Sequence, residues 1–113
     1  MPESYLYPLF YDPNSGQPTT SQISFGAMGD SFYEYLIKVA IYLRADPKAS
    51  SQYNRMFHLT MEGMMRDLVA RTEKSGLIYV GERKNGRFQK KMDHLACFTA
   101  GMLVLGVEVR CPY

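Results

Sequence analysis

The sequence predicts a mainly α-helical fold with one small β-hairpin, and three observations support this prediction. An apolar segment over residues 30–44 and an amphipathic segment over residues 50–73 both show helical spacing of their apolar side chains. The dipeptide Asn85-Gly86 stands between two short strand-like runs and is a strong hairpin signal. Strands and helices do not alternate along the chain, so no parallel sheet is expected.

The N-terminal segment, residues 1–29, is expected to be a long structured loop or irregular hairpin rather than a linker. It holds several prolines, serines and threonines, and a turn signal lies at residues 12–16. Short extended pieces over residues 6–11 and 22–25 flank this turn.

The first helix is expected from Asp30 to about Arg44, with Asp30 as its N-cap, and Asp46-Pro47 ends it. It is apolar nearly all round, which is typical of a helix buried in a larger helical assembly. Glu34 follows Asp30 by four residues, so the two carboxylates are expected on one helix face. The alternative is that Asp30 only caps the helix and Glu34 is simply solvated.

The second helix is expected to begin with Ser50 or Ser51 as N-cap and to end near Glu73. Its apolar side chains recur every three to four residues and predict one core-facing stripe: Tyr53, Phe57, Met61, Met64, Met65 and Leu68.

The remaining elements are a hairpin and a third helix. Residues 77–80 and 87–89 are expected to pair across the Asn85-Gly86 turn. The basic residues on this hairpin indicate a solvated turn rather than a nucleic-acid site. Asp93 is expected to cap a helix that runs through Leu105, with His94 in its first turn.

The composition excludes several classes of partner. The chain has 113 residues, enough for one domain with a core, and its net charge of +2 argues against nucleic-acid and membrane-surface partners. The longest apolar stretch, residues 35–43, is shorter than the about 20 residues that span a bilayer, and no leader sequence is evident. Two cysteines, Cys97 and Cys111, leave the redox compartment open.

Two unusual blocks of sequence carry a family resemblance. They are residues 29–38 (GDSFYEYLIK) and residues 91–98 (KMDHLACF), with residues 77–82 (LIYVGE) between them. This arrangement closely resembles the class I α-1,2-mannosidases, glycoside hydrolase family 47, over residues 6–106. The resemblance implies an (α/α)7 barrel, to which this chain would contribute two to three helix-hairpin elements. Residues 1–113 are therefore expected to form part of a catalytic domain, with no complete domain in this chain.

The resemblance also implies an activity and a set of site residues. The expected activity of the full-length parent is calcium-dependent hydrolysis, with inversion, of terminal α-1,2-linked mannose from high-mannose N-glycans. Asp30 matches the family's catalytic aspartate, and Glu34, Asp93 and His94 match residues of the sugar-binding cavity. Met28 stands where endoplasmic-reticulum members carry arginine and Golgi members carry an apolar residue, so it favours the Golgi type.

Asp30 and Glu34 are not expected to be the complete acid/base pair. Inverting glycosidases place their two carboxyl groups about 6.5–9.5 Å apart, on opposite faces of the sugar. Helical neighbours four residues apart have Cβ atoms about 5–6 Å apart and point the same way. The pair is therefore expected to form one wall of the site.

Other parts that the resemblance implies are expected outside this sequence. These are the calcium ligands, the remaining catalytic carboxylates and the membrane anchor that would hold the parent in the Golgi or endoplasmic reticulum lumen. The isolated chain is consequently expected to be inactive. Cys97 matches a family cysteine whose disulfide partner lies further along, while Cys111 is either a free thiol or a substitute partner.

Two alternatives to a processing mannosidase remain. The first is a mannosidase-like, glycan-binding protein of the misfolded-glycoprotein disposal pathway. Such relatives share the core of residues 30–35 but differ where this chain has residues 91–94, so the second block favours the processing enzymes. The other alternative is an inactive fragment that serves as an interaction module.

Overall fold

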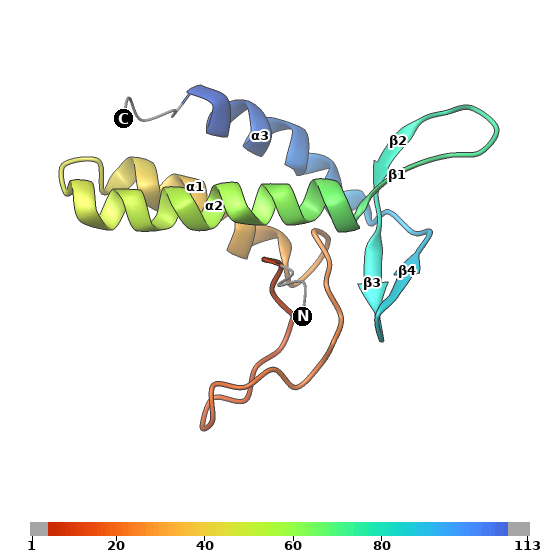
Figure 1. Cartoon of the computed structure of the whole chain (residues 1–113), viewed down its shortest axis with the longest axis horizontal. Coiled ribbons are helices and arrows are strands. Elements are labelled where there is room, and N and C mark those ends of the chain that lie inside the picture. The colour runs from red at the N-terminus through yellow and green to blue at the C-terminus, as the bar shows by residue number, and fades with distance from the viewer. Residues whose placement is uncertain (1–4, 109–113) are drawn as a thin grey trace.

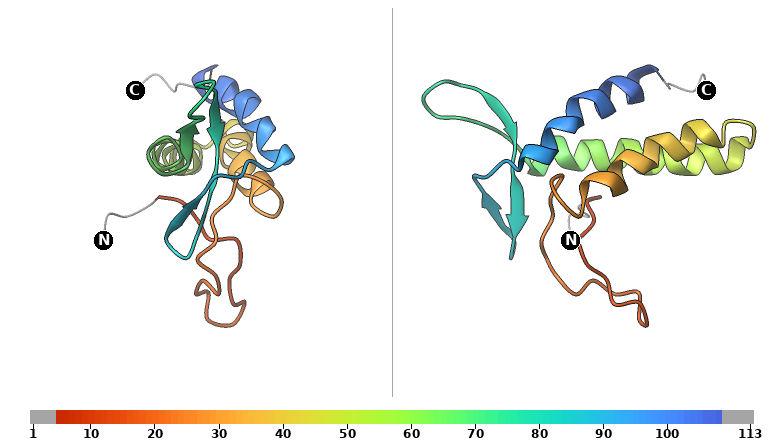
Figure 2. Two further views of the ribbon diagram at one scale, coloured as in Figure 1. Left: turned by 90° about the vertical axis from the view of Figure 1, so that its right-hand side faces the viewer. Right: turned by 180° about the vertical axis from the view of Figure 1, so that it is seen from behind.

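The computed structural model describes residues 5–108, which form helices and two small sheets (Figure 1). Helices α1 (Asp30–Tyr42) and α2 (Pro47–Asp67) form an antiparallel pair. The 3-10 helix η1 (His94–Phe98) leads into α3 (Thr99–Glu108), which packs against α1 and runs in the same general direction (Figure 2). The prediction of a mainly helical fold with a small β element is confirmed. Within the described part, no helix is long and apolar enough to cross a membrane.

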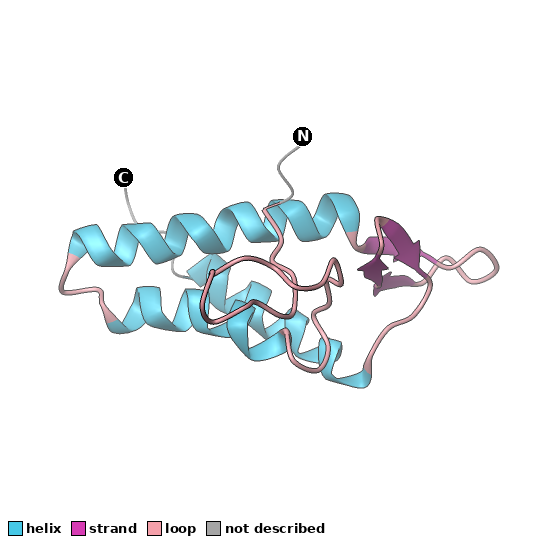
Figure 3. Cartoon of the chain, turned by 90° about the horizontal axis from the view of Figure 1, so that it is seen from below, coloured by secondary structure: helices cyan, strands magenta, loops and turns pink. Residues whose placement is uncertain are grey.

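The strands form two antiparallel hairpins at one end of the helices (Figure 3). Strand β1 (Val69–Arg71) pairs with β2 (Ile78–Val80), and β3 (Glu82–Lys84) pairs with β4 (Arg87–Gln89). The predicted turn at Asn85-Gly86 is confirmed, since both residues have the positive φ that such a turn requires.

The predicted partner of residues 77–80 was wrong. This run pairs with β1 instead of β4, because α2 ends at Asp67 and leaves the following residues free to form a strand. The Gly81 N–H then donates to the Leu68 carbonyl at 2.8 Å, so the chain passes from the first hairpin to the second at Gly81.

The predicted start of the second helix was also wrong. Asp46 is the N-cap of α2, and its carboxylate accepts the N–H groups of Lys48 and Ala49 at 3.1 and 3.2 Å. Pro47 occupies the first helical turn, where its missing N–H costs nothing. The dipeptide that was expected only to end the first helix therefore begins the second.

The core lies between α1 and α2 and extends to α3. The stripe of α2 is confirmed for the buried Phe57, Met61, Met64 and Leu68, whereas Met65 is 58% exposed because it follows Met64 by about 100° around the helix. The main buried side chains of α1 are Tyr33, Leu36, Ile37 and Ala40.

The first helix is apolar nearly all round in sequence, and part of its apolar surface is exposed within residues 5–108. Phe32, Tyr35 and Tyr42 of α1 are exposed, with Tyr42 the most open at 86%. Helices α2 and α3 pack on α1, and the ring of Tyr7 lies 4.9 Å from that of Phe32, but Tyr35 and Tyr42 remain largely uncovered by the described residues.

The N-terminal segment forms the expected irregular hairpin. Its arms are joined by backbone hydrogen bonds, including Leu9 N–H to the Gln22 carbonyl at 2.9 Å. Ile23 then bridges to Arg83 of β3 through two backbone hydrogen bonds of 2.9 and 3.0 Å. This bridge attaches the chain just before α1 to the second hairpin.

Candidate functional site

Asp30 is the first residue of α1 and not its N-cap, which corrects the sequence prediction. Gly29 is the N-cap, and the carbonyl of Gly26 accepts the N–H groups of both Gly29 and Asp30, at 3.2 and 2.9 Å. The Asp30 carboxylate accepts the N–H of Ser31 at 2.8 Å. The half-buried carboxylate therefore lies at the helix start, where the helix dipole favours negative charge.

Glu34 lies one turn further along α1 and is held by a neighbour rather than by Asp30. Its carboxylate accepts a hydrogen bond from the ammonium group of Lys38, in an i, i+4 ion pair. Glu34 also lines a hollow of about 250 Å³ between α1 and the C-terminal elements, opposite Phe98 and Met102. Asp30 does not line this hollow, so the structure does not place the two carboxylates in one cavity.

Tyr33, which lies between the two acidic residues, anchors this part of α1. Its ring stacks on Phe25 with centroids 4.0 Å apart, and its hydroxyl both accepts the Tyr7 N–H and donates to the Tyr7 carbonyl, each at 3.1 Å. Burial raises the pKa of Tyr33 to about 12, so the hydroxyl stays protonated and remains a donor. The aromatic residues of the 29–38 block thus tie the carboxylate-bearing helix to the N-terminal segment.

Met28 lies in the turn before α1 in a strained conformation. Its φ of 74° is rare for a residue with a side chain, and the side chain is 67% exposed. Backbone strain of this kind is concentrated at ligand sites. Met28 lines a hollow of about 470 Å³ together with Tyr7 and Phe32.

The second block meets the turn that precedes the first block, at Gly26. The half-buried Asp93 packs so closely on this glycine that a Cβ added to Gly26 would lie 2.4 Å from the Cβ of Asp93. Asp93 also caps η1, as predicted for the third helix, by accepting the Leu95 N–H at 2.9 Å. His94 follows it as an exposed residue at the start of η1. The fold therefore brings Asp93 against the turn that leads to Asp30.

Cys97 is exposed and forms no disulfide with any residue that the structure describes. Cys111 lies outside the described residues. The expected disulfide between Cys97 and a cysteine further along remains a prediction.

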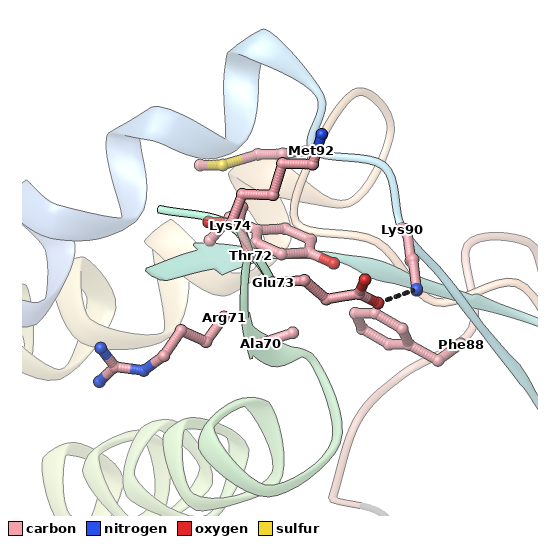
Figure 4. A pocket seen from close by; sticks show the side chains of 9 residues that line it. Ala70, Arg71, Thr72, Glu73, Lys74, Phe88, Lys90 and Met92 are labelled. Carbon is pink, nitrogen blue, oxygen red and sulfur yellow. Dashed lines mark hydrogen bonds and ion pairs between the residues drawn. The ribbon is translucent and has the colours of Figure 1, made fainter. Parts of the chain in front are cut away.

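A separate hollow of about 590 Å³ lies between the β1–β2 hairpin and the chain after β4 (Figure 4). The rings of Tyr79 and Phe88 lie in its wall, and a 3.1 Å ion pair joins Glu73 to Lys90 at its rim. None of the predicted site residues lines this hollow, although Met92, which does, directly precedes Asp93.

Residues 5–108 contain no group of three or more His, Cys, Asp or Glu side chains arranged to hold a metal ion.

Residues 77–82 belong to the family resemblance, but the sequence assigns no role to Ser24 or Glu82. The structure links both residues to the turn before Asp30. Both are buried, and the Ser24 hydroxyl donates to Oε1 of Glu82 at 2.9 Å. They are 58 residues apart in the chain, so only the fold reveals the contact.

Asp and Glu carboxyl groups are the groups with which most glycoside hydrolases act. The model of the family described as glycosyl hydrolase family 47 matches residues 1–112. The chain is 40% identical over 103 residues to "Mannosyl-oligosaccharide 1,2-alpha-mannosidase IB" of Mus musculus. It is 39% identical over 104 residues to "Endoplasmic reticulum mannosyl-oligosaccharide 1,2-alpha-mannosidase" of Saccharomyces cerevisiae. The chain belongs to glycosyl hydrolase family 47.

These matches cover most of this chain but little of the relatives. They include 91% of this chain with the mouse protein and 89% with the yeast protein, but only 15% and 18% of those proteins' own lengths. The family resemblance seen in residues 29–38 and 91–98 is confirmed.

Proposed function

We propose that this chain supplies part of the active site of an α-1,2-mannosidase that removes terminal mannose from high-mannose N-glycans. The observation that carries the proposal is the contact of the second block with the turn before the first block: Asp93 packs on Gly26, and the Gly26 carbonyl accepts the N–H of Asp30. The family match and the printed names of the relatives agree with a mannosidase acting on mannosyl-oligosaccharides.

In this proposal Asp30 is the catalytic carboxylate. A carboxylate at this helix start suits a group that activates or positions water, or one that exchanges a proton with the leaving oxygen. Glu34, Met28, Asp93 and His94 contact the substrate. The second carboxylate that inversion requires comes from another part of the catalytic domain.

The rest of the proposal concerns the whole protein. Residues 1–113 form one portion of a catalytic domain with the (α/α)7 fold, and the exposed side of α1 packs there on further helices. Calcium ligands come from outside this chain. The parent acts in the lumen of the Golgi or endoplasmic reticulum.

A chimera tests the proposal directly. In it, the matched 103 residues of this chain replace the corresponding segment of the mouse enzyme. We expect the chimera to release mannose from a nine-mannose glycan in calcium-containing buffer, as followed by mass spectrometry. The isolated 113-residue chain should release none above a buffer control, since only part of the catalytic set is encoded. Release by the isolated chain, or a folded but inactive chimera, would contradict the proposal.

Met28 provides a prediction about glycan branches. Methionine has no hydrogen-bond donor, so it should leave the site open to several branches, whereas an arginine would offer five donors in a rigid fork. We expect the unmodified chimera to trim all terminal α-1,2-linked mannoses and Met28→Arg to favour one branch. A time course with the nine-mannose glycan compares the two. Met28→Leu is the apolar control, and arrest of the unmodified chimera after one mannose would contradict the prediction.

A further inference from the structure

Glu82 is the one buried carboxylate among residues 5–107, and the site residues discussed above do not account for it. Only 6% of the residue is exposed, at the start of β3. A buried charge is costly unless hydrogen bonds and an opposite charge compensate it. Its partners therefore indicate why the residue lies there.

The first partner of Glu82 is Ser24, which is hydrogen-bonded to the turn before α1. The Ser24 hydroxyl donates to Oε1 of Glu82 at 2.9 Å, and the same hydroxyl oxygen accepts the N–H of Gly26 at 2.9 Å. The Gly26 carbonyl in turn accepts the N–H of Asp30. A buried chain of three hydrogen bonds thus joins Glu82 to the backbone of the proposed catalytic residue.

The second partner of Glu82 is Lys91, the first residue of the 91–98 block. The Lys91 ammonium lies 3.8 Å from Oε1 of Glu82, two residues before Asp93. Asp93 itself rests on Gly26, the glycine that Ser24 holds. Glu82 therefore contacts both segments that meet at Gly26: the loop before α1 through Ser24, and the start of the 91–98 block through Lys91.

We propose that Glu82 is a positioning residue for the active site. Through Ser24 and Lys91 it fixes the turn before Asp30 and the segment before Asp93 in their positions relative to each other. The inference rests on the proposed function. This role explains why a carboxylate occupies a buried strand position, since it can accept a hydrogen bond from one segment and form an ion pair with another. Small displacements of a catalytic group are sufficient to slow a reaction strongly.

Kinetics of the chimera test this role. We expect Glu82→Ala to lower kcat by roughly 10-fold or more while KM stays nearly unchanged, because the misplaced group acts in the transition state. Glu82→Gln keeps an oxygen that accepts from Ser24 and should restore most of kcat. Ser24→Ala should also lower kcat, and the double variant should be no slower than Glu82→Ala alone, since Glu82→Ala already removes the link to Ser24.

The control is Glu73, which is also paired with a lysine but has an 85% exposed side chain. Glu73→Ala and Glu73→Gln should leave kcat unchanged. Equal kcat for Glu82→Ala and Glu73→Ala would overturn the proposal. So would a Glu82→Gln variant as slow as Glu82→Ala at equal thermal stability, because the hydrogen bond to Ser24 would then not be the cause.

A second measurement separates this inference from the proposed function. In the 113-residue chain, hydrogen exchange of the Asp30 amide reports on the Gly26–Asp30 bond, and the Ser50 amide, bonded to the Asp46 carbonyl at 2.9 Å, serves as a reference. We expect Glu82→Ala to speed exchange at Asp30 and not at Ser50. Equal changes at both sites would show a general loss of stability and would overturn the positioning role, whether or not the chimera is active.

Discussion

Replacing Asp30 with asparagine should lower the kcat of the chimera by about 10² or more, which is typical of losing an acid, base or water-positioning group. Asparagine has nearly the same shape and keeps an oxygen that can accept the Ser31 N–H, as the carboxylate does at 2.8 Å. The start of α1 should therefore survive the change. The loss should appear in kcat more than in KM, because the lost interaction belongs to the transition state.

Asp46→Asn is the matched control for this experiment. Asp46 also lies at a helix start and accepts backbone N–H groups, but at the N-cap of α2 on the exposed surface. Asparagine caps helices as well as aspartate does, so this variant should keep both kcat and stability. If Asp30→Asn behaved like Asp46→Asn, Asp30 would have only a structural role at the start of its helix. Steady-state kinetics measures the kcat and KM of both variants, and thermal melting measures their stability.

Replacing Phe57 with alanine should destabilise the fold by about 3–5 kcal/mol, the usual effect of removing a buried aromatic ring. Phe57 is 2% exposed and lies between α2 and α3. A loss of this size is a large part of the about 5–15 kcal/mol by which folded domains are stable. Urea unfolding of the 113-residue chain, followed by circular dichroism, measures the change. Met65→Ala, on the exposed side of the same helix, should change the free energy of unfolding far less.

Gly106 provides an independent check on this contact. A Cβ at this position would lie 2.4 Å from a ring carbon of Phe57, so Gly106→Ala should force the ring to move. The two substitutions should therefore not be additive: Gly106→Ala should be clearly destabilising alone and much less so beside Phe57→Ala. Additive effects of the two substitutions would show that the ring and the glycine do not touch.

The family-specific blocks were recognisable without the structure, whereas their mutual arrangement was not. Residues 29–38 and 91–98 predicted the family, and the contact of Asp93 with Gly26 shows how the fold brings the two blocks together. The Ser24–Glu82 contact had no sequence signal, because the burial of a carboxylate depends on which segments close over it. A serine in a loop and a glutamate in a strand are usually exposed.

The sequence by itself determined the features that depend on near neighbours. These include the Asn85-Gly86 turn, the cap that Asp93 forms and most of the apolar stripe of α2, since each follows from the chemistry of a few adjacent residues. Only the tertiary structure decided that β2 pairs with β1 and that the turn before α1 rests on Asp93. It also moved the cap of α1 from Asp30 to Gly29, because the Gly26 carbonyl binds the N–H groups of both residues. Each of these contacts joins two segments that could also pair with other segments of the chain. The packing of the whole chain decides which of these pairings forms.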